Sequence, residues 1–217
     1  MPSDHPLYGF PYPGYYLLDE EGVVTGKFFN KENNDRFMSA NILVRQFGAK
    51  VGERQGEAKS KHLTLEWSAT NTTLRPGQRS ALVLHVKLKP GMHLYAPGDH
   101  EYISVDWPME APAGTEILEV KYPQAEMVNL PVIKQTVPVY EGSLELVRDI
   151  HLLGGSLLPD SLEGQDSLEI QGEFKYQACD DKACYLPATI PLKWTFTLAP
   201  HDLERVPEEI RRGAQGS

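Results

Sequence analysis

The sequence predicts a mainly β protein, an antiparallel β-sandwich preceded by a β-hairpin and a helix. From residue 62 onward, apolar and polar residues alternate with a period of two, which is typical of half-buried strands. Turn signals such as RPGQ, KPGM, APGD and LEGQD separate these stretches. Before residue 49 the pattern differs, and two short strands are followed by apolar residues at helical spacing.

Composition supports a soluble globular domain and excludes several classes of partner. The chain has 217 residues, of which 41% are hydrophobic and 24% are charged, enough for one sizeable sandwich. Its formal net charge is -9 without a basic stripe, which argues against nucleic acid or an anionic membrane surface as a partner. No apolar run approaches the roughly 20 residues of a spanning helix, and no signal peptide is evident, so we expect no direct membrane insertion.

The first predicted unit comprises residues 1–48. Strands are expected at Tyr15–Leu18 and Val23–Phe29, joined by the turn DEEG. A helix should follow, with Asn34 or Asp35 as its N-cap and Gly48 at its end. Its apolar positions are Phe37, Met38, Ile42 and Phe47. A hairpin and one helix cannot bury a core of their own, so this unit should dock on something larger.

Three further segments complete the predicted organisation. Residues 49–61, AKVGERQGEAKSK, are polar and charged and predict a linker. Residues 62–200 form the sandwich, and residues 201–217 a tail with one helical turn around VPEEIRR. Within the sandwich the expected strands are HLTLEWSATNTTL, SALVLHVKLK, EYISVDW, TEILEVKY, GSLELVRDI, SLEIQGEFKYQAC and ATIPLKWTFTL.

Both cysteines of the chain lie in one predicted hairpin. The residues before Cys179 and after Cys184 alternate as strands do, and DDKA between them predicts a turn. Cross-strand partners in a hairpin lie close enough for a disulfide. Closing so short a loop adds only about 2 kcal/mol of stability. The pair is therefore poorly placed as a staple and well placed as a reversible dithiol.

Two other interpretations of the pair stay open at this point. One is a structural hairpin disulfide, or two thiols without a function. The other is a metal site, which is weaker, because C-x4-C lacks a second ligand pair and the nearest downstream histidine, His201, is distant in sequence. Asp180 and Asp181 in the turn disfavour a thiolate, so we expect a dithiol that reacts with a specific partner rather than indiscriminately.

The region from about His62 to Leu198 resembles the N-terminal periplasmic domain of the thiol:disulfide interchange protein DsbD. The resemblance rests on PGMHLYAPG, VPVYEGSLEL and, most specifically, YQACDDKACYLPATIPLKW. It implies an immunoglobulin-like sandwich. It also implies that Cys184 forms mixed disulfides with partners, while Cys179 resolves them. No organic cofactor or metal is implied, because the two cysteines carry the electrons.

The same resemblance implies supporting residues around the cysteines. His93 and Tyr95 match positions whose side chains pack beside the active hairpin, although ordinary cross-strand packing explains them equally well. Tyr185 is the aromatic residue that follows the second cysteine in the family pattern. The family covers its cysteines with a cap loop bearing an aromatic ring. Here the corresponding stretch, MVNLPVIKQ, offers only aliphatic cap candidates, which are Leu130, Val132 and Ile133.

The N-terminal segment has a separate resemblance. FPYPGYYLLDEEGVVTGKFF is similar to the last third of a thioredoxin-like redoxin domain of the AhpC/TSA type, with Pro11 or Pro13 as the proline before the strand. The part of a redoxin that carries the cysteines is absent. We therefore expect a parent protein in which a redoxin precedes the sandwich, with this chain beginning inside the redoxin. A native appendage packed on the sandwich is the alternative.

These observations lead to one main expectation and one alternative. The main expectation is a thiol:disulfide oxidoreductase of the protein-disulfide reductase type, located outside the cytoplasm. It would exchange electrons with thioredoxin-like proteins, and with a membrane-embedded donor or a redoxin domain of the same parent. The alternative is a non-enzymatic β-sandwich that binds a partner and carries a structural disulfide.

Overall fold

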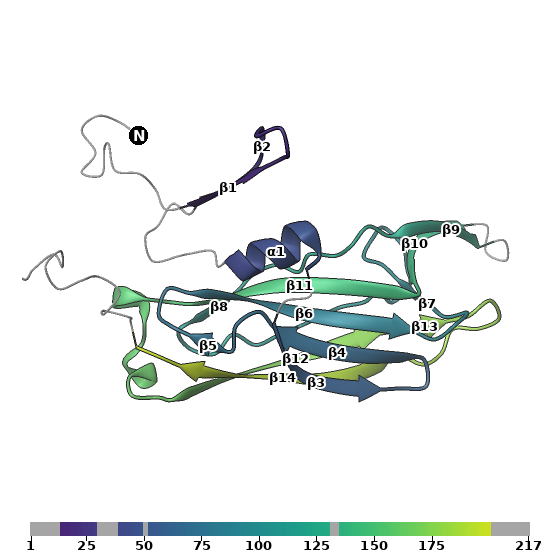
Figure 1. The fold of residues 1–217 in the computed structure, drawn as a ribbon. Coiled ribbons are helices and arrows are strands. Elements are labelled where there is room, and N and C mark those ends of the chain that lie inside the picture. Colours follow the sequence, from purple (N-terminus) through teal and green to yellow (C-terminus); the bar gives the residue numbers. More distant parts are fainter. Residues whose placement is uncertain (1–13, 30–38, 50–51, 131–134, 201–217) are drawn as a thin grey trace, which may run out of the picture.

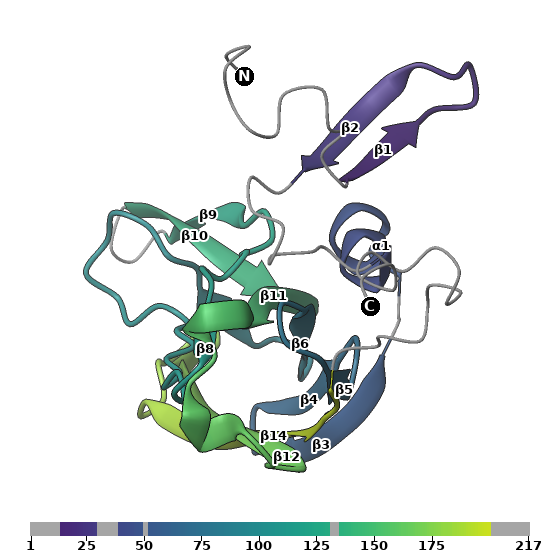
Figure 2. The same cartoon turned by 90° about the vertical axis from the view of Figure 1, so that its left-hand side faces the viewer.

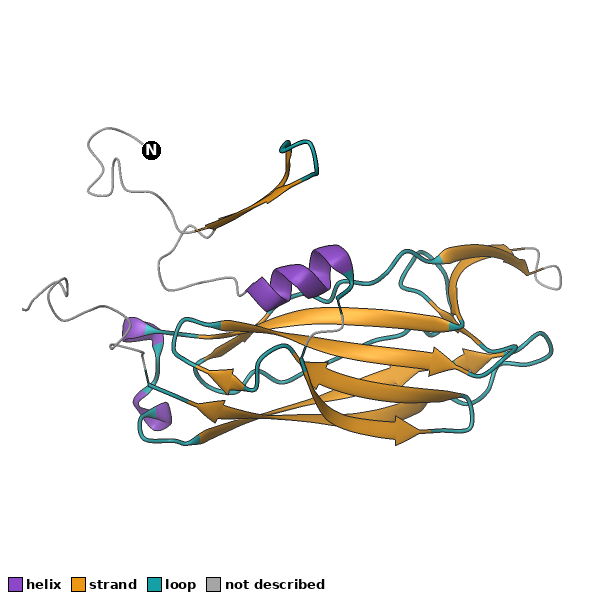
Figure 3. Cartoon of the chain, in the orientation of Figure 1, coloured by secondary structure: helices purple, strands orange, loops and turns teal. Residues whose placement is uncertain are grey.

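A computed structural model describes residues 14–29, 39–49, 52–130 and 135–200 (Figure 1). The predicted mainly β fold, an antiparallel sandwich of the immunoglobulin-like kind with an N-terminal hairpin and helix, is confirmed (Figure 3). Across these residues, no helix has the length and apolar character that crossing a membrane requires.

Two sheets form the layers of the sandwich. The larger has the order β3-β4-β6-β11-β8 and the smaller the order β12-β14-β5. All neighbours are antiparallel except β14 and β5, which are parallel. The strands of the larger sheet are β3 (Glu53–Lys59), β4 (Leu63–Ala69), β6 (Arg79–Leu88), β8 (Thr115–Ile117) and β11 (Ser143–Leu152). Those of the smaller sheet are β5 (Thr73–Leu74), β12 (Ser167–Tyr176) and β14 (Ala188–Leu198).

A third sheet lies at one end of the sandwich, on the right in Figure 1. Its order is β13-β7-β10-β9. The strands are β7 (His93–Tyr95), β9 (Glu126–Leu130), β10 (Gln135–Glu141) and β13 (Ala178–Cys179). Two 3-10 turns, η1 (Gly155–Leu157) and η2 (Asp160–Leu162), lie at the opposite end. The cysteine hairpin therefore belongs to the end sheet and not to the two main layers.

The two main sheets face each other in the end-on view (Figure 2), and the core side chains come from the strands of both sheets. The alternation of side chains along a strand explains which residues enter the core: alternate residues of β14 face inward and the others face water. The largest fully buried side chains of the core are Trp107, Trp194, Phe174 and Phe196. Burying aromatic rings of this size supplies most of the driving force for folding.

Two tryptophans join the sheets by reciprocal hydrogen bonds. The indole N–H of Trp67 on β4 donates to the carbonyl of Lys193 at 2.9 Å, and that of Trp194 on β14 donates to the carbonyl of Ser68 at 3.1 Å. Gly56 on β3 makes room for this arrangement, because a Cβ there would lie 2.1 Å from the Trp67 ring. The indoles thus combine apolar burial with satisfied donors.

The N-terminal elements are β1 (Gly14–Leu18), β2 (Val24–Phe29) and α1 (Ser39–Phe47). Ile42 and Val44 of α1 are buried, and Val44 packs on the outer face of the larger sheet against Ala81, Val83 and Val147. Gly48 ends the helix as predicted, at a φ of 59°, with its N–H donating to the carbonyl of Val44. The predicted N-caps and Pro11 or Pro13 lie outside the described residues.

The predicted linker is wrong for most of its length. Glu53–Lys59 form β3, which pairs with β4 at the edge of the larger sheet. Its polar composition reflects that position, because edge strands commonly carry charge that discourages pairing with other molecules. Glu57 contacts both Arg54 and Lys59 there.

Two other expectations need correction. EYISVDW forms only isolated bridges, at Ser104 and Asp106, because the chain turns there to bury Trp107. TEILEVKY contains a strand of three residues, β8. Of the stretch expected as a cap loop, residues 127–130 belong to β9 and Gln135 begins β10, while its centre lies outside the described residues, so the cap stays a prediction. The helical turn expected in the tail lies outside the described residues.

Phe196 tests the position of the core. We expect Phe196→Ala to lower the free energy of unfolding by about 3–5 kcal/mol, because its fully buried ring would leave a cavity between the sheets. Thr195→Ala, the neighbouring position on the solvent face of β14, should change it by less than about 0.5 kcal/mol. Urea denaturation of both variants measures the difference, and equal losses would contradict the assigned faces.

Candidate functional site

The two cysteines face each other across a hairpin that continues from β13. They form an isolated antiparallel bridge with a Cα–Cα distance of 4.0 Å, and their sulfurs are bonded at 2.06 Å. Backbone hydrogen bonds flank the pair on both sides, from Asp180 N–H to the Ala183 carbonyl and from Tyr185 N–H to the Ala178 carbonyl, each at 2.9 Å. The cysteines thus occupy a non-hydrogen-bonded position, where facing residues come closest.

The two sulfur-bearing residues differ in their access to solvent. Cys179 is 1% exposed and packs with Tyr95, Val137 and Val139 on the outer face of the end sheet. Cys184 is exposed. Leu186, two residues further on, is 89% exposed, so an apolar side chain in water adjoins the accessible cysteine.

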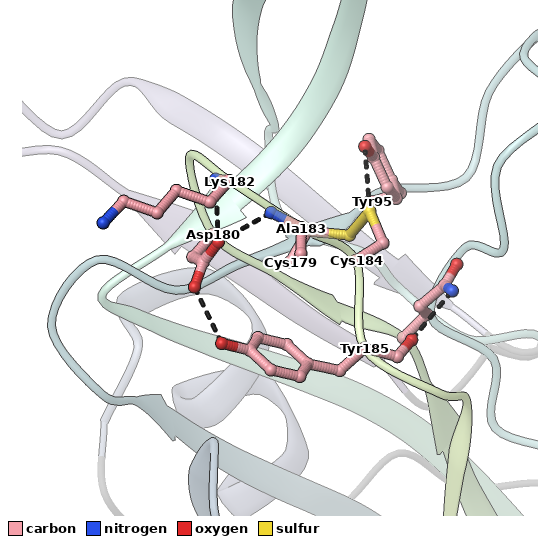
Figure 4. The surroundings of a disulfide bond; sticks show 8 residues. Tyr95, Cys179, Asp180, Lys182, Ala183, Cys184 and Tyr185 are labelled. Carbon is pink, nitrogen blue, oxygen red and sulfur yellow. Dashed lines mark hydrogen bonds between the residues drawn. A yellow bond between two sulfur atoms is a disulfide. The ribbon is translucent and has the colours of Figure 1, made fainter.

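Tyr95 links β7 to the exposed cysteine (Figure 4). Its hydroxyl lies 3.7 Å from the Cys184 sulfur, and because a disulfide sulfur carries no proton, the hydroxyl is the donor. Burial, together with nearby Tyr102, raises the pKa of Tyr95, which keeps the hydroxyl protonated. The Tyr102 ring stacks on Tyr95 at 4.3 Å, and His100 borders both rings.

His93 lies on the same strand face as Tyr95, as predicted, and its ring contacts Tyr95 edge-on at 5.6 Å. It is 9% exposed, and its Nε2 has no hydrogen-bond partner among the described residues. The strand register places it directly opposite Cys179 on β13 and directly opposite Glu141 on β10.

Asp180 organises the turn between the cysteines (Figure 4). Its Oδ1 accepts hydrogen bonds from the backbone N–H groups of Lys182 and Ala183, and its Oδ2 accepts one from the Tyr185 hydroxyl, all at 2.8 Å. The Tyr185 bond, with the two backbone bonds, lowers the pKa of Asp180, and the same bond raises the pKa of Tyr185. Both shifts favour the ionised carboxylate with the protonated phenol, so the turn keeps its bonds across the neutral pH range.

The turn between β3 and β4 contacts the Tyr185 ring. The ring of His62 lies 4.4 Å from the Tyr185 ring, and the Lys61 ammonium lies 5.0 Å from its centre. Ser60 accepts a hydrogen bond from the Tyr176 hydroxyl at 3.0 Å. These contacts could not be predicted from the sequence, because Lys61 falls in the expected linker and His62 at the first sandwich strand, far from Tyr185 along the chain.

The structure therefore gathers most of the predicted site residues around the disulfide. Cys179, Cys184, Tyr95, Asp180 and Tyr185 are in mutual contact or adjacent. His93 joins them through Tyr95, and Asp181 is exposed at the tip of the turn. Of the cap candidates, Val132 and Ile133 lie outside the described residues. Leu130 ends β9, where its backbone pairs with Gln135.

Among residues 14–29, 39–49, 52–130 and 135–200, no three His, Cys, Asp or Glu side chains gather where they could hold a metal ion. Both cysteine sulfurs are already bonded to each other.

Two of the solved structures to which this chain is similar are the following. One is the N-terminal periplasmic domain of ScsB from Proteus mirabilis, with a TM-score of 0.47 and 11% sequence identity. The match covers 66% of this chain and 51% of that one, so this chain spans about half of that structure's length. The yeast GGA1 GAE domain matches with a TM-score of 0.33 and 13% identity over 64% of this chain and 97% of that one.

Comparison by sequence gives a family. No curated protein sequence matches the chain. The family described as thiol:disulfide interchange protein DsbD, N-terminal, matches residues 60–193, a region that starts after the N-terminal hairpin and helix. The redoxin resemblance of that segment stays a prediction. Because the match spans more than half of the residues and contains both cysteines, the chain belongs to the family of DsbD N-terminal domains.

Proposed function

We propose that this domain exchanges electrons with thioredoxin-like proteins through the Cys179–Cys184 pair. The observation that carries the proposal is the unequal burial of the two cysteines. Cys184 is exposed beside the edge strand of the end sheet, whereas Cys179 on that strand is 1% exposed. An incoming sulfur can reach only Cys184, so the unequal burial decides which cysteine forms the mixed disulfide.

The reaction proceeds in two balanced steps from the reduced domain. The Cys184 thiolate attacks one sulfur of the partner's disulfide, forming a mixed disulfide and releasing the partner's other sulfur as a thiolate. The Cys179 thiolate then attacks the Cys184 sulfur. The Cys179–Cys184 bond forms, the mixed disulfide breaks, and the partner leaves with both of its thiols. The domain loses two electrons, the partner gains them, and the reverse sequence reduces the domain.

The hairpin suits this cycle because its shape does not rely on the sulfur bond. Two backbone hydrogen bonds flank the cysteines and three more hold Asp180. The side-chain amide of Gln177 also donates to the Tyr185 carbonyl at 2.9 Å. With the thiols held near each other, resolution of the mixed disulfide is favoured over its persistence.

Family membership supports a proposal for the partners and the compartment. We place the domain outside the cytoplasm, where disulfides persist. There it would act as an oxidoreductase of the protein-disulfide reductase type, receiving electrons from a membrane-embedded donor or passing them to a redoxin domain of the same parent. The competing function, a binding sandwich with a structural disulfide, predicts a bond that reductants leave intact.

Trapping tests the assignment of roles. Reduced Cys179→Ser should accumulate a mixed disulfide between Cys184 and an oxidised thioredoxin-like protein, because the resolving thiol is missing. Cys184→Ser should form little adduct, since its remaining thiol is buried. Non-reducing electrophoresis and mass spectrometry measure both adducts. Stronger trapping by the Cys184→Ser variant would reverse the roles, and trapping by neither would contradict the proposal.

The reduction potential separates a functional bond from a structural one. Titration in dithiothreitol redox buffers should give a value above about -300 mV, the approximate upper limit for structural disulfides. Reduction should also lower the free energy of unfolding by only about 2 kcal/mol, because the closed loop is short. Urea denaturation of both redox forms measures this loss. A lower potential together with a reduced form that unfolds would favour the structural alternative.

A further inference from the structure

We propose that His93 is the base that takes the proton from the Cys179 thiol when the mixed disulfide is resolved. The inference rests on the proposed exchange function and adds a residue to its second step. Three facts carry it, namely the burial of Cys179, the register of β7 and the unpartnered Nε2 of His93.

Cys179 needs a base because its surroundings disfavour the reactive form. Only a thiolate attacks a disulfide sulfur at a useful rate. Cys179 is 1% exposed, and burial in apolar surroundings penalises a thiolate. Its neighbour Asp180 carries a negative charge, which adds to the penalty. Water has little access to remove the proton.

His93 is the titratable side chain directly opposite Cys179. The two are Cα partners on adjacent antiparallel strands, so their side chains share one face with Cβ atoms about 4.5–5.5 Å apart. The same register continues to Glu141 on β10 and, through the hairpin bridge, to Cys184. One row across the strands therefore reads Glu141, His93, Cys179, Cys184.

The unpartnered nitrogen of His93 has an explanation in the reduced state. A buried polar atom without a partner is uncommon and costs free energy. In the disulfide form Cys179 has no proton to offer Nε2. Reduction creates an S–H group on the facing residue, which can donate to it. A phenylalanine would pack against Tyr95 equally well without that cost.

The proton balance closes within the exchange cycle. The Cys179 thiol gives its proton to Nε2 of neutral His93, and the resulting thiolate attacks the Cys184 sulfur. The Cys179–Cys184 bond forms as the partner's sulfur leaves, and the imidazolium returns the proton to that leaving thiolate. Besides Cys179, the register places Glu141 opposite His93, and the Tyr95 ring contacts the His93 ring edge-on.

Stopped-flow release from a chromogenic aromatic disulfide, dithiobis(nitrobenzoate), tests the proposal on the reduced chain. Attack by Cys184 releases the first coloured thiolate, and resolution by Cys179 releases the second. In His93→Gln, the first release should keep its wild-type rate, and the second should slow on the order of 100-fold at neutral pH. The rate of the second release in this variant should also rise about tenfold per pH unit, as expected when the thiol ionises without a base. The wild-type rate should rise less steeply with pH.

Control variants separate a base from a packing residue. His93→Phe keeps the ring against Tyr95 and should slow the second release as His93→Gln does. His85→Gln changes a histidine of the larger sheet that pairs with Glu145 at 3.0 Å, and should change neither phase. Circular dichroism confirms that each variant is folded.

Each outcome bears on one of the two proposals. A second phase unchanged in rate and pH dependence in both His93 variants would overturn the role of His93 while leaving the exchange function intact. Equal slowing of both phases, or a normal second phase in His93→Phe alone, would assign His93 to packing and overturn the inference too. Wild-type protein that releases no coloured thiolate would overturn the exchange function itself.

Discussion

The register of β7 is the constraint on which the site depends. This strand of three residues lies between β13 and β10 and decides which side chains share the outer face of the end sheet. Because side chains alternate, a slip of one residue would turn His93 and Tyr95 toward the core and bring Leu94 out. Leu94 is fully buried in the main core, which makes such a slip costly.

Stability and chemistry are located in different parts of the molecule. The two main sheets bury the aromatic core and are joined by the reciprocal bonds of Trp67 and Trp194. The cysteine hairpin extends from the end sheet. Its turn is held by Asp180 and by the contact of the Tyr185 ring with His62. The Cys179–Cys184 bond therefore lies outside the aromatic core between the two main sheets.

A strand could be predicted from the sequence only where its local pattern of apolar and polar residues is distinctive. The alternation in residues 167–179 and 188–198 predicted β12 and β14 and hence the cysteine hairpin. The polarity of β3 concealed an edge strand, because polar residues serve edge strands and linkers equally. EYISVDW alternates as a strand does, yet it turns inward to bury Trp107.

Within the site, sequence could identify the chemical groups but not their surroundings. The difference in exposure between Cys179 and Cys184 depends on packing against β7 and β10, which is a long-range property. The same holds for His62 and Lys61 against Tyr185, since β3 and β4 bring them there. Register, which pairs His93 with Cys179, needs the sheet order before it can be inferred.

The exposed side chain of Leu186 beside Cys184 bears on which kinds of molecule can bind there. Covering a leucine is worth about 1.5–3 kcal/mol when the whole side chain leaves water. A protein surface is broad enough to gain that energy, whereas a small thiol such as glutathione is not. In the proposed exchange, Leu186 therefore offers a macromolecular partner binding energy that a low-molecular-weight thiol cannot gain.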